Sequence, residues 1–136
     1  MVEPKQVIVM RKDLNMRKGK MIAQGAHASM AVLLDMMGPP YEHARDIYID
    51  RTLSYFPGSP MDLWLNGSFT KIAVGVNSLS ECEEIYNQAK EMGIPCSLIT
   101  DKGLTEFGDV PTITCCAIGP DYSERINKLT GHLKLL

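Results

Sequence analysis

The sequence predicts an α/β fold, in which a largely parallel sheet is layered with helices, and three observations support this. Short apolar segments rich in β-branched residues alternate along the chain with longer amphipathic segments. The 136 residues suffice for one domain with a substantial core. The composition, 45% hydrophobic and 22% charged, is ordinary for a globular protein. We therefore expect residues 1–136 to form a single α/β domain.

Four apolar segments are expected to form the strands of the sheet. Three of them, QVIVM, KIAVGV and PCSLIT, are short runs at residues 6–10, 71–76 and 95–100. The fourth is TITCCAIG at residues 112–119. Each run is bounded by polar or turn-forming residues, which is typical of buried strands.

The first helix is expected over residues 19–34. At 100° per residue its apolar side chains share one face, which we predict to pack on the sheet. The residues of this predicted packing face are Ile22, Ala26, Ser29, Met30 and Leu33. Three polar residues, Lys20, Gln24 and His27, then fall on the opposite face.

Two more helices are expected further along the chain. Residues 80–93 (SECEEIYNQAKEMG) carry acidic side chains in the first turn and end on a glycine. Ser78 or Ser80 can cap this helix at its N-terminus. Ser123 is expected to begin a short last helix.

Residues 38–62 form an excursion from this regular pattern. The segment begins with GPP and ends with PGSP, and it is acidic, with Glu42, Asp46 and Asp50. Its middle, residues 41–56, can form a helix with Pro40 near the first turn, although the periodicity is weak. We interpret the excursion as a lid or a surface for a partner.

The four cysteines favour neither a metal site nor a catalytic thiol. Cys82, Cys96, Cys115 and Cys116 form no CxxC pair and show no metal-ligand spacing with the histidines. Cys115 and Cys116 are neighbours in an expected strand, so they should point to opposite faces. We expect buried, reduced thiols, and a catalytic cysteine is the weaker alternative because no basic partner lies nearby.

Positive charge is concentrated at the start of the chain. Residues 1–20 hold six basic side chains against two acidic ones, whereas the whole chain has a net charge of −2. This distribution favours one localised anion-binding surface. The alternative is a solvated, lysine-rich terminus.

The expected topology brings several polar side chains to one edge of the sheet. Lys20 follows the first strand after a loop, and Asp101 follows the third strand directly. Parallel strands would place both residues at the same edge, where sites of α/β proteins form. A fourth strand running antiparallel would bring its first residue, Thr112, to that edge as well.

Several classes of function are not indicated. Gly19 and Lys20 resemble part of a phosphate-binding P-loop, but Leu14 and Met21 stand where that motif requires glycine and Ser or Thr. A helix N-terminus can still bind an anion without the motif. No apolar run approaches the ~20 residues of a membrane span. The first ten residues also lack a signal-peptide pattern, so we expect a cytosolic protein.

Four segments carry a joint signature: VIVMRKDLNMRKGKMIAQGAHA, LWLNGSFTKIAV, GIPCSLITDKGLTE and TITCCAIGPDYSERINKLTGHLKLL. Within them, GK-x-x-A-Q-x-x-H, D-x-G-x-T-E, and IGP followed by TGHLKL are specific in combination. Together they resemble the type II peptidyl-tRNA hydrolases, and only residues 38–62 fall outside the resemblance.

The resemblance implies a three-layer α/β/α domain whose mixed four-stranded sheet has the order 2-1-4-3, with strand four antiparallel. It implies hydrolysis of the ester between a peptide, or an N-blocked amino acid, and the 3′-ribose of tRNA, which recycles the tRNA. It also implies tRNA as the partner, a homodimer, and no metal or other cofactor.

Carried over by position, the family's implicated residues fall on Lys20, Gln24, His27, Asp101 and Thr105, with Lys20, Asp101 and Thr105 as the catalytic core. In ester hydrolysis Lys20 can stabilise the oxyanion or hold the terminal phosphate. Asp101 can orient Lys20 and position or deprotonate water. Thr105 can donate to the carbonyl or relay a proton, and a threonine nucleophile stays open. Gln24 and His27 are expected to bind substrate, with a structural histidine as the alternative.

The basic residues at the start of the first helix are expected to contact RNA. Cations are unfavourable at a helix N-terminus, so the basic residues here suggest an anionic partner such as an RNA backbone. They are Arg11, Lys12, Arg17 and Lys18. Thr112 is a further candidate for substrate binding.

Two features depart from the family's pattern. Lys102, where the family usually has alanine, can lower the pKa of Asp101 or contact phosphate. The acidic excursion at residues 38–62 is longer than usual. Two rival functions therefore stay open, a catalytically idle binding module of the same fold and a hydrolase of another acyl ester.

Overall fold

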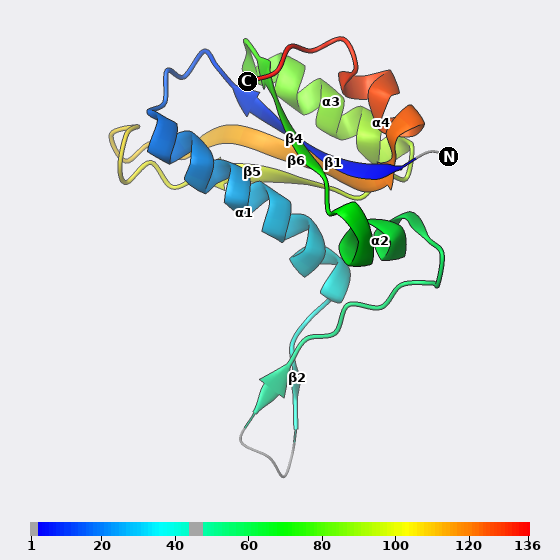
Figure 1. Cartoon of the computed structure of the whole chain (residues 1–136). Helices are drawn as coiled ribbons and strands as arrows, with labels where there is room; N and C mark the ends of the chain where they lie inside the picture. Colours follow the sequence, from blue (N-terminus) through cyan, green and yellow to red (C-terminus); the bar gives the residue numbers. More distant parts are fainter. Residues whose placement is uncertain (1–2, 44–47) are drawn as a thin grey trace.

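A four-stranded sheet lies at the centre of the protein (Figure 1). The computed structural model describes residues 3–43 and 48–136. The strands are β1 (Pro4–Arg11), β4 (Lys71–Val76), β5 (Cys96–Asp101) and β6 (Thr112–Tyr122). Their order across the sheet is β4-β1-β6-β5. β1 is parallel to β4, and β6 is antiparallel to both of its neighbours.

The fold class agrees with the prediction. Two short strands outside this sheet, β2 (Tyr41–Glu42) and β3 (Ile49–Asp50), pair with each other, and Figure 1 labels β2. Counted within the sheet alone, the strands have the order 2-1-4-3 with the fourth antiparallel. The alternation of strands and helices predicted a largely parallel sheet, and three strands do share one direction. The exception is β6, which enters between β1 and β5.

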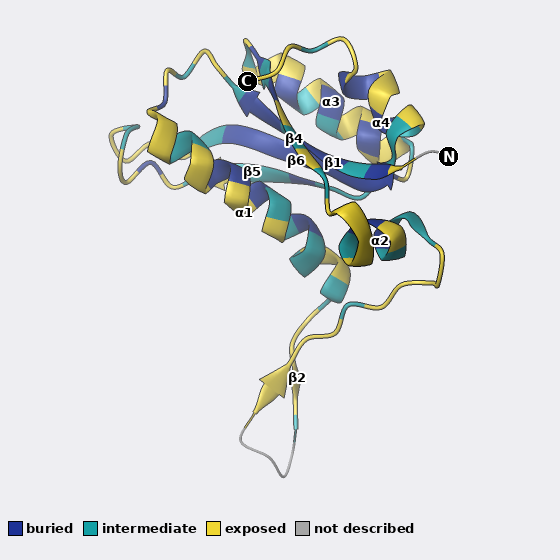
Figure 2. Cartoon of the chain, viewed as in Figure 1, coloured by how far each residue is buried: buried dark blue, intermediate teal, exposed yellow. Residues whose placement is uncertain are grey.

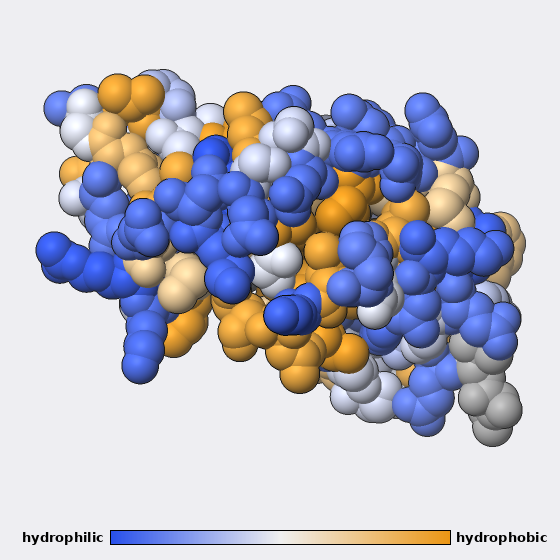
Figure 3. Space-filling model, turned by 90° about the horizontal axis from the view of Figure 1, so that it is seen from above, coloured by the Kyte–Doolittle hydropathy of each residue, from blue (hydrophilic) through white to orange (hydrophobic). Residues whose placement is uncertain are grey.

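Helices cover both faces of the sheet and complete the three layers (Figure 1). One face is covered by α1 (Lys18–Met37), the other by α3 (Leu79–Glu91) and α4 (Ser123–Thr130). Ser78 caps α3 by accepting a hydrogen bond from the Glu81 amide. The surface seen from the side of α3 and α4 is mostly hydrophilic, with apolar side chains between the charged ones (Figure 3).

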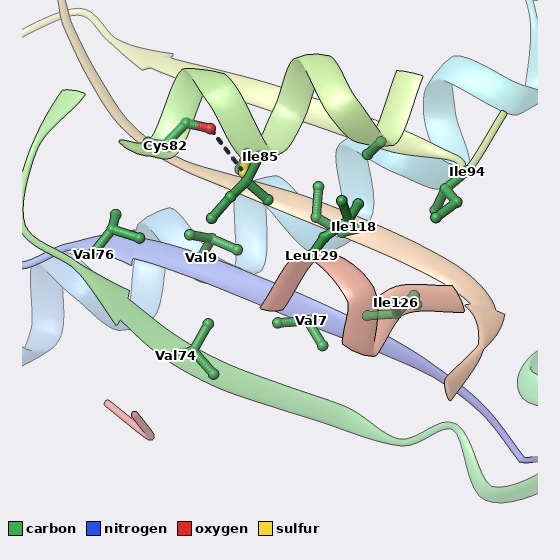
Figure 4. Packing of buried hydrophobic residues seen from close by; sticks show 12 residues of the cluster. Val7, Val9, Val74, Val76, Cys82, Ile85, Ile94, Ile118, Ile126 and Leu129 are labelled. Carbon is green, nitrogen blue, oxygen red and sulfur yellow. Dashed lines mark hydrogen bonds between the residues drawn. The ribbon is translucent and has the colours of Figure 1, made fainter. Parts of the chain in front are cut away.

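The larger core lies between the sheet and the α3–α4 layer (Figure 4). Valines of β1 and β4 pack there against Ile85, Ile118 and Ile126. A smaller core lies between the sheet and α1. Figure 2 shows the result as two deeply buried central strands, β1 and β6, beneath partly exposed helices. Burial of this apolar surface is the main favourable contribution to folding.

The predicted packing face of α1 is wrong. The buried residues of the helix are Gln24, Gly25, Ala28 and Val32. From the predicted face, Ile22 is 73% exposed and Met30 is 50% exposed. The prediction from apolar periodicity failed for two reasons. Small residues of α1 pack closely against the sheet, and the polar side chain of Gln24 is buried there as well.

The predicted helix over residues 41–56 is also wrong, as far as the described residues show. A two-stranded hairpin of β2 (Tyr41–Glu42) and β3 (Ile49–Asp50) projects from the end of α1 (Figure 1). Residues 44–47, including Asp46, lie outside the described residues. The His43 ring lies 2.9 Å from an oxygen of Asp50 and stacks with Tyr48, and such cross-strand pairs stabilise hairpins.

The chain returns to the sheet through two short helical turns. These are α2 (Pro60–Leu63) and η1 (Trp64–Ser68), and the fully buried Trp64 donates from its indole nitrogen to the Thr70 carbonyl. After α4, the last residues run along the outer edge of β4, where Leu135 pairs with Val74. None of the helices in the described residues is long and apolar enough to cross a membrane.

The cysteines are free thiols, as predicted. Cys115 belongs to the core under α1, and Cys116 belongs to the core under α3 and α4. Burial raises the pKa of Cys115 to about 12, so its reactive thiolate is disfavoured. The thiol of Cys116 donates to the backbone carbonyl of Cys82 (Figure 4). Within residues 3–43 and 48–136, no group of three or more His, Cys, Asp or Glu side chains is arranged to hold a metal.

Candidate active site

Lys20, in the first turn of α1, lies at the centre of a polar cluster. Its Nζ donates to Asp101 Oδ1 at 2.9 Å and to Thr105 Oγ1 at 2.5 Å. The Lys20 and Asp101 side chains are only 12% and 14% exposed. The sheet edge predicted from the order of strands therefore does bring Lys20 and Asp101 together, and Thr105, which only the family resemblance indicated, joins them from the loop after β5. Neighbouring side chains cover most of this pair, so its attraction should exceed that of a fully exposed pair.

Asp101 is held in its ionised form. Lys20, the strongest influence, keeps the pKa of Asp101 below its usual value, and the Gly103 amide and Gln24 act in the same direction. Partial burial alone would raise the pKa. The Gly103 amide donates to Oδ2 at 2.9 Å, while Oδ1 accepts from Lys20 and from Gln24. A carboxylate with so many donors is a weak base and a firm anchor for Lys20.

The loop after β5 delivers Thr105 to the cluster, and Gly103 shapes that loop. Gly103 has a φ of 83°, and a Cβ at this position would lie 2.3 Å from the Val110 carbonyl oxygen. Only glycine fits such a close approach. Because the Thr105 oxygen accepts a hydrogen bond from Lys20, its own hydroxyl proton is free to point outward. Phe107, on the same loop, places its ring 5.7 Å from Nζ of Lys20.

Gln24 connects the cluster to a residue that sequence reasoning missed, Thr114. The hydroxyl of Thr114 donates to Gln24 Oε1 at 2.6 Å, and Gln24 Nε2 donates to Asp101 Oδ1 at 3.2 Å. Thr114 is fully buried. The donor at Thr114 fixes the orientation of the Gln24 amide, so that its NH₂ group points at the carboxylate.

The position of Thr114 depends on a β-bulge. Ile113 pairs with Thr100 and Cys115 pairs with Ile99, so Thr114 is one extra residue in β6. A bulge interrupts the alternation of side chains along a strand. Thr114 and Cys115 therefore both face α1, and strand periodicity gave no sign of this.

Thr112 lies at the predicted edge, opposite Asp101 in the sheet, but its hydroxyl has another use. It donates to the Val110 carbonyl at 2.8 Å and so holds the loop that carries Thr105.

His27 is exposed and makes no hydrogen bond to another described residue. It lines a groove between α1 and the β5 side of the sheet, together with Lys20, Gln24, Asp101 and Lys102. Lys102 is not among the groups that lower the pKa of Asp101.

The basic residues near the start of α1 have different surroundings. Arg17 is 90% exposed, and its Nε lies 3.7 Å from Glu106, which also accepts a hydrogen bond from the Arg17 amide. Glu106 thus supplies negative charge at the N-terminus of α1, where the helix has no acidic residue of its own. Lys18 is exposed.

Arg11 is the basic candidate that the structure uses differently. Its guanidinium is mostly buried and donates to both carboxylate oxygens of Asp13 and to the Ile113 carbonyl. These contacts tie the loop after β1 to β6. They favour a structural role for Arg11 over a free phosphate contact.

The comparisons with known proteins cover nearly the whole chain. The sequence model of the family described as Peptidyl-tRNA hydrolase PTH2 matches residues 4–136. A peptidyl-tRNA hydrolase of Methanocaldococcus jannaschii is 42% identical over 132 residues, which is 97% of this chain and 99% of that protein. A peptidyl-tRNA hydrolase of Sulfolobus acidocaldarius is 35% identical over the same shares of both chains.

A solved structure shows the same fold in a distant protein. This structure, of a protein of unknown function from Agrobacterium tumefaciens, matches with a TM-score of 0.55 at 14% identity. The match covers 100% of this chain and 99% of that one. On the strength of the family match and the two archaeal relatives, the chain belongs to the PTH2 family of peptidyl-tRNA hydrolases.

Proposed function

We propose that this protein hydrolyses the ester bond between a peptide and the 3′-terminal ribose of tRNA, with Lys20, Asp101 and Thr105 as its catalytic residues. The observation that carries this proposal is the hydrogen-bonded cluster of these three residues at one end of an open groove. Membership of the PTH2 family supports the reaction and the substrate.

The hydrogen bonds in the cluster suggest a role for each side chain. Water adds to the ester carbonyl carbon and the bond to the ribose oxygen breaks. Of the two protons of the water, one goes to the ribose oxygen and the other is released to solvent, so the peptide leaves as a carboxylate. The Lys20 ammonium and the free Thr105 hydroxyl proton are the donors for the developing oxyanion. Asp101 holds Lys20 in place and offers its carboxylate to orient the attacking water.

The remaining site residues are proposed to position the substrate. Gln24 supports Asp101 from within the protein, and His27 lies on the groove wall, where it can reach bound substrate. Arg17 and Lys18 are exposed at the start of α1 and are suited to RNA phosphates. Thr112 acts through the loop that it holds.

The test is release of free tRNA from N-acetylaminoacyl-tRNA, compared with hydrolysis of a small acyl ester. The proposal predicts turnover of the tRNA ester, with affinity that falls steeply as salt rises because phosphate contacts release counterions. Lys18→Ala should reduce the slope of log affinity against log salt by about 1. Preference for the small ester without salt dependence would favour another acyl hydrolase, and tRNA binding without turnover would favour an idle binding module.

We also propose that the protein forms a homodimer and works in the cytoplasm, where peptidyl-tRNA arises. Support for a dimer comes from the exposed apolar side chains of α1, since Ile22 and Met30 line one groove with Phe69 and Leu136. Sedimentation velocity tests this. Wild type is expected to sediment as a dimer and Ile22→Glu as a monomer, and a monomeric wild type at all concentrations would contradict the dimer.

A further inference from the structure

The groove that begins at Lys20 extends well beyond the catalytic cluster. Its volume is about 700 Å³. Polar side chains, those of Lys20, Gln24, Asp101 and Thr105, gather at one end. The groove then follows α1 toward its C-terminus, where its lining becomes apolar: Met30, Ala31 and Leu34 on the helix, with Leu98 and Ile99 on β5. This apolar part plays no role in the chemistry described above.

The dimensions of the groove fit an extended peptide. From Lys20 to Leu34 the helix advances by about 21 Å, at ~1.5 Å per residue. An extended chain of about six residues spans the same length, at ~3.3 Å per residue. β5 is the edge strand of the sheet, so no further strand closes this side of the groove. A chain can therefore enter and leave along the groove without threading through a hole.

The position of the reacting ester gives the substrate a direction. The exposed cations near the start of α1, Arg17 and Lys18, lie on the N-terminal side of Lys20, and an RNA backbone is attracted there. The apolar lining lies on the C-terminal side of Lys20 along the same helix. The RNA and the acyl part of the substrate are joined at the ester. If the RNA lies on the basic side of Lys20, the acyl part must therefore lie on the apolar side.

We propose that the apolar part of this groove binds the peptide of peptidyl-tRNA over several residues before the ester, with a preference for apolar side chains. This inference rests on the proposed function and assigns the peptide part of the substrate a contribution to affinity beside that of the RNA phosphates. Ala31 contributes a small side chain to the apolar part of the lining, beside Met30 and Leu34, so a larger side chain there would fill the space meant for the peptide.

The experiment compares three substrates that differ only in the acyl part: N-acetyl-leucyl-tRNA, N-acetyl-tetraleucyl-tRNA and N-acetyl-tetraglycyl-tRNA. Wild type should show a KM about tenfold lower for the tetraleucyl substrate than for the other two, because burial of two leucine side chains contributes more than ~1.4 kcal/mol. The kcat values should be similar, since these contacts are the same in ground state and transition state.

Two variants locate the effect in the groove. Ala31→Phe should raise the KM for the tetraleucyl substrate to the KM for N-acetyl-leucyl-tRNA, so that the tetraleucyl advantage is lost. Ala23→Phe, an equal change at an exposed position of α1 that does not line the groove, should keep the advantage. Circular dichroism and thermal melts confirm that both variants are folded.

The outcomes separate this inference from the proposed function. Equal KM values for all three substrates in wild type, or an Ala31→Phe variant that keeps the tetraleucyl advantage, would overturn the peptide groove while hydrolysis itself stands. A wild type that cleaves none of the substrates would overturn the proposed function first.

Discussion

The two ends of α1 differ in how their surroundings hold them. At the N-terminal end, Lys20 is fixed by side chains from β5 and the following loop, and Gln24 is fixed from β6. At the C-terminal end, the hairpin of Tyr41–Glu42 and Ile49–Asp50 projects into solvent, and all four of these strand residues are exposed. The sequence marked both regions as candidates for function. Among the described residues, the first region has the ordered network of polar side chains that catalysis requires.

The same comparison favours one of the two interpretations of residues 38–62. A lid over the active site was one of two interpretations from the sequence. The excursion leaves the fold at the C-terminal end of α1 (Lys18–Met37), about 26 Å from Lys20 along the helix axis at ~1.5 Å per residue. In this position the described part of the excursion is suited to a partner surface rather than to a lid.

The largest effect is expected at the carboxylate. Asp101→Asn keeps the shape but removes the charge that anchors Lys20, so kcat should fall by roughly two orders of magnitude or more. Asp109→Asn is the matched control: it lies on the same loop with a φ of 63°, which asparagine tolerates, and should keep near wild-type kcat. Equal activity of the two variants would contradict the role of Asp101.

A smaller effect is expected at Thr114. Thr114→Val keeps the volume but leaves Gln24 Oε1 without its donor, at a cost of about 1–3 kcal/mol. The released amide should orient Asp101 less well, lower kcat about tenfold and move the acid limb of the pH–rate profile upward. Thr114→Ser restores the hydroxyl and should recover most of the activity. An unshifted profile in the valine variant would make Thr114 a packing residue only.

The lowered pKa of Asp101 predicts how stability depends on pH. A carboxyl whose pKa is depressed by folding stabilises the protein above its unfolded pKa of ~3.9, and this contribution is lost as pH falls through the folded pKa. Lys20→Met removes the main cause of the depression. The difference in unfolding free energy between wild type and Lys20→Met should therefore shrink between about pH 5 and pH 2.

Urea unfolding at several pH values measures this difference. Asp13 also has a lowered pKa, because Arg11 donates to it, but that pair is present in both proteins and cancels. A difference that stays constant with pH would show that Lys20 and Asp101 are not coupled in the folded protein.

The smallest effect is expected at the hairpin. Tyr41 and Asp50 are paired across it, so replacing residues 41–50 by a short Gly-Ser linker joins positions that already lie close together. The kcat on N-acetylaminoacyl-tRNA should stay within about twofold, because no described contact connects the hairpin to the catalytic cluster. A Tm change of only a few degrees is expected, since exposed surface is removed. A large loss of kcat in the tRNA-release assay would instead support the interpretation of residues 38–62 as a lid.

The sequence predicted those parts of the structure that depend on local pattern. The sheet segments, the Ser78 cap and the convergence of Lys20 with Asp101 follow from periodicity and strand direction. The packing face of α1 could not be predicted, because burial of Gln24 depends on a partner 90 residues away, Thr114. Thr114 itself was missed because a β-bulge in β6 interrupts the alternation of side chains on which the prediction relied. The hairpin was missed because its strands have only two residues each and carry no measurable period.

The most direct test of the central claim is the single-turnover rate of Lys20→Met on N-acetylaminoacyl-tRNA at saturating enzyme. This change keeps most of the side-chain volume and removes the ammonium that bonds to Asp101 and Thr105. If Lys20 stabilises the oxyanion, the rate should fall by about 10²–10³-fold, equivalent to ~3–4 kcal/mol, while the variant stays folded and still binds tRNA. A folded Lys20→Met that cleaves at the wild-type rate would place the reacting centre elsewhere.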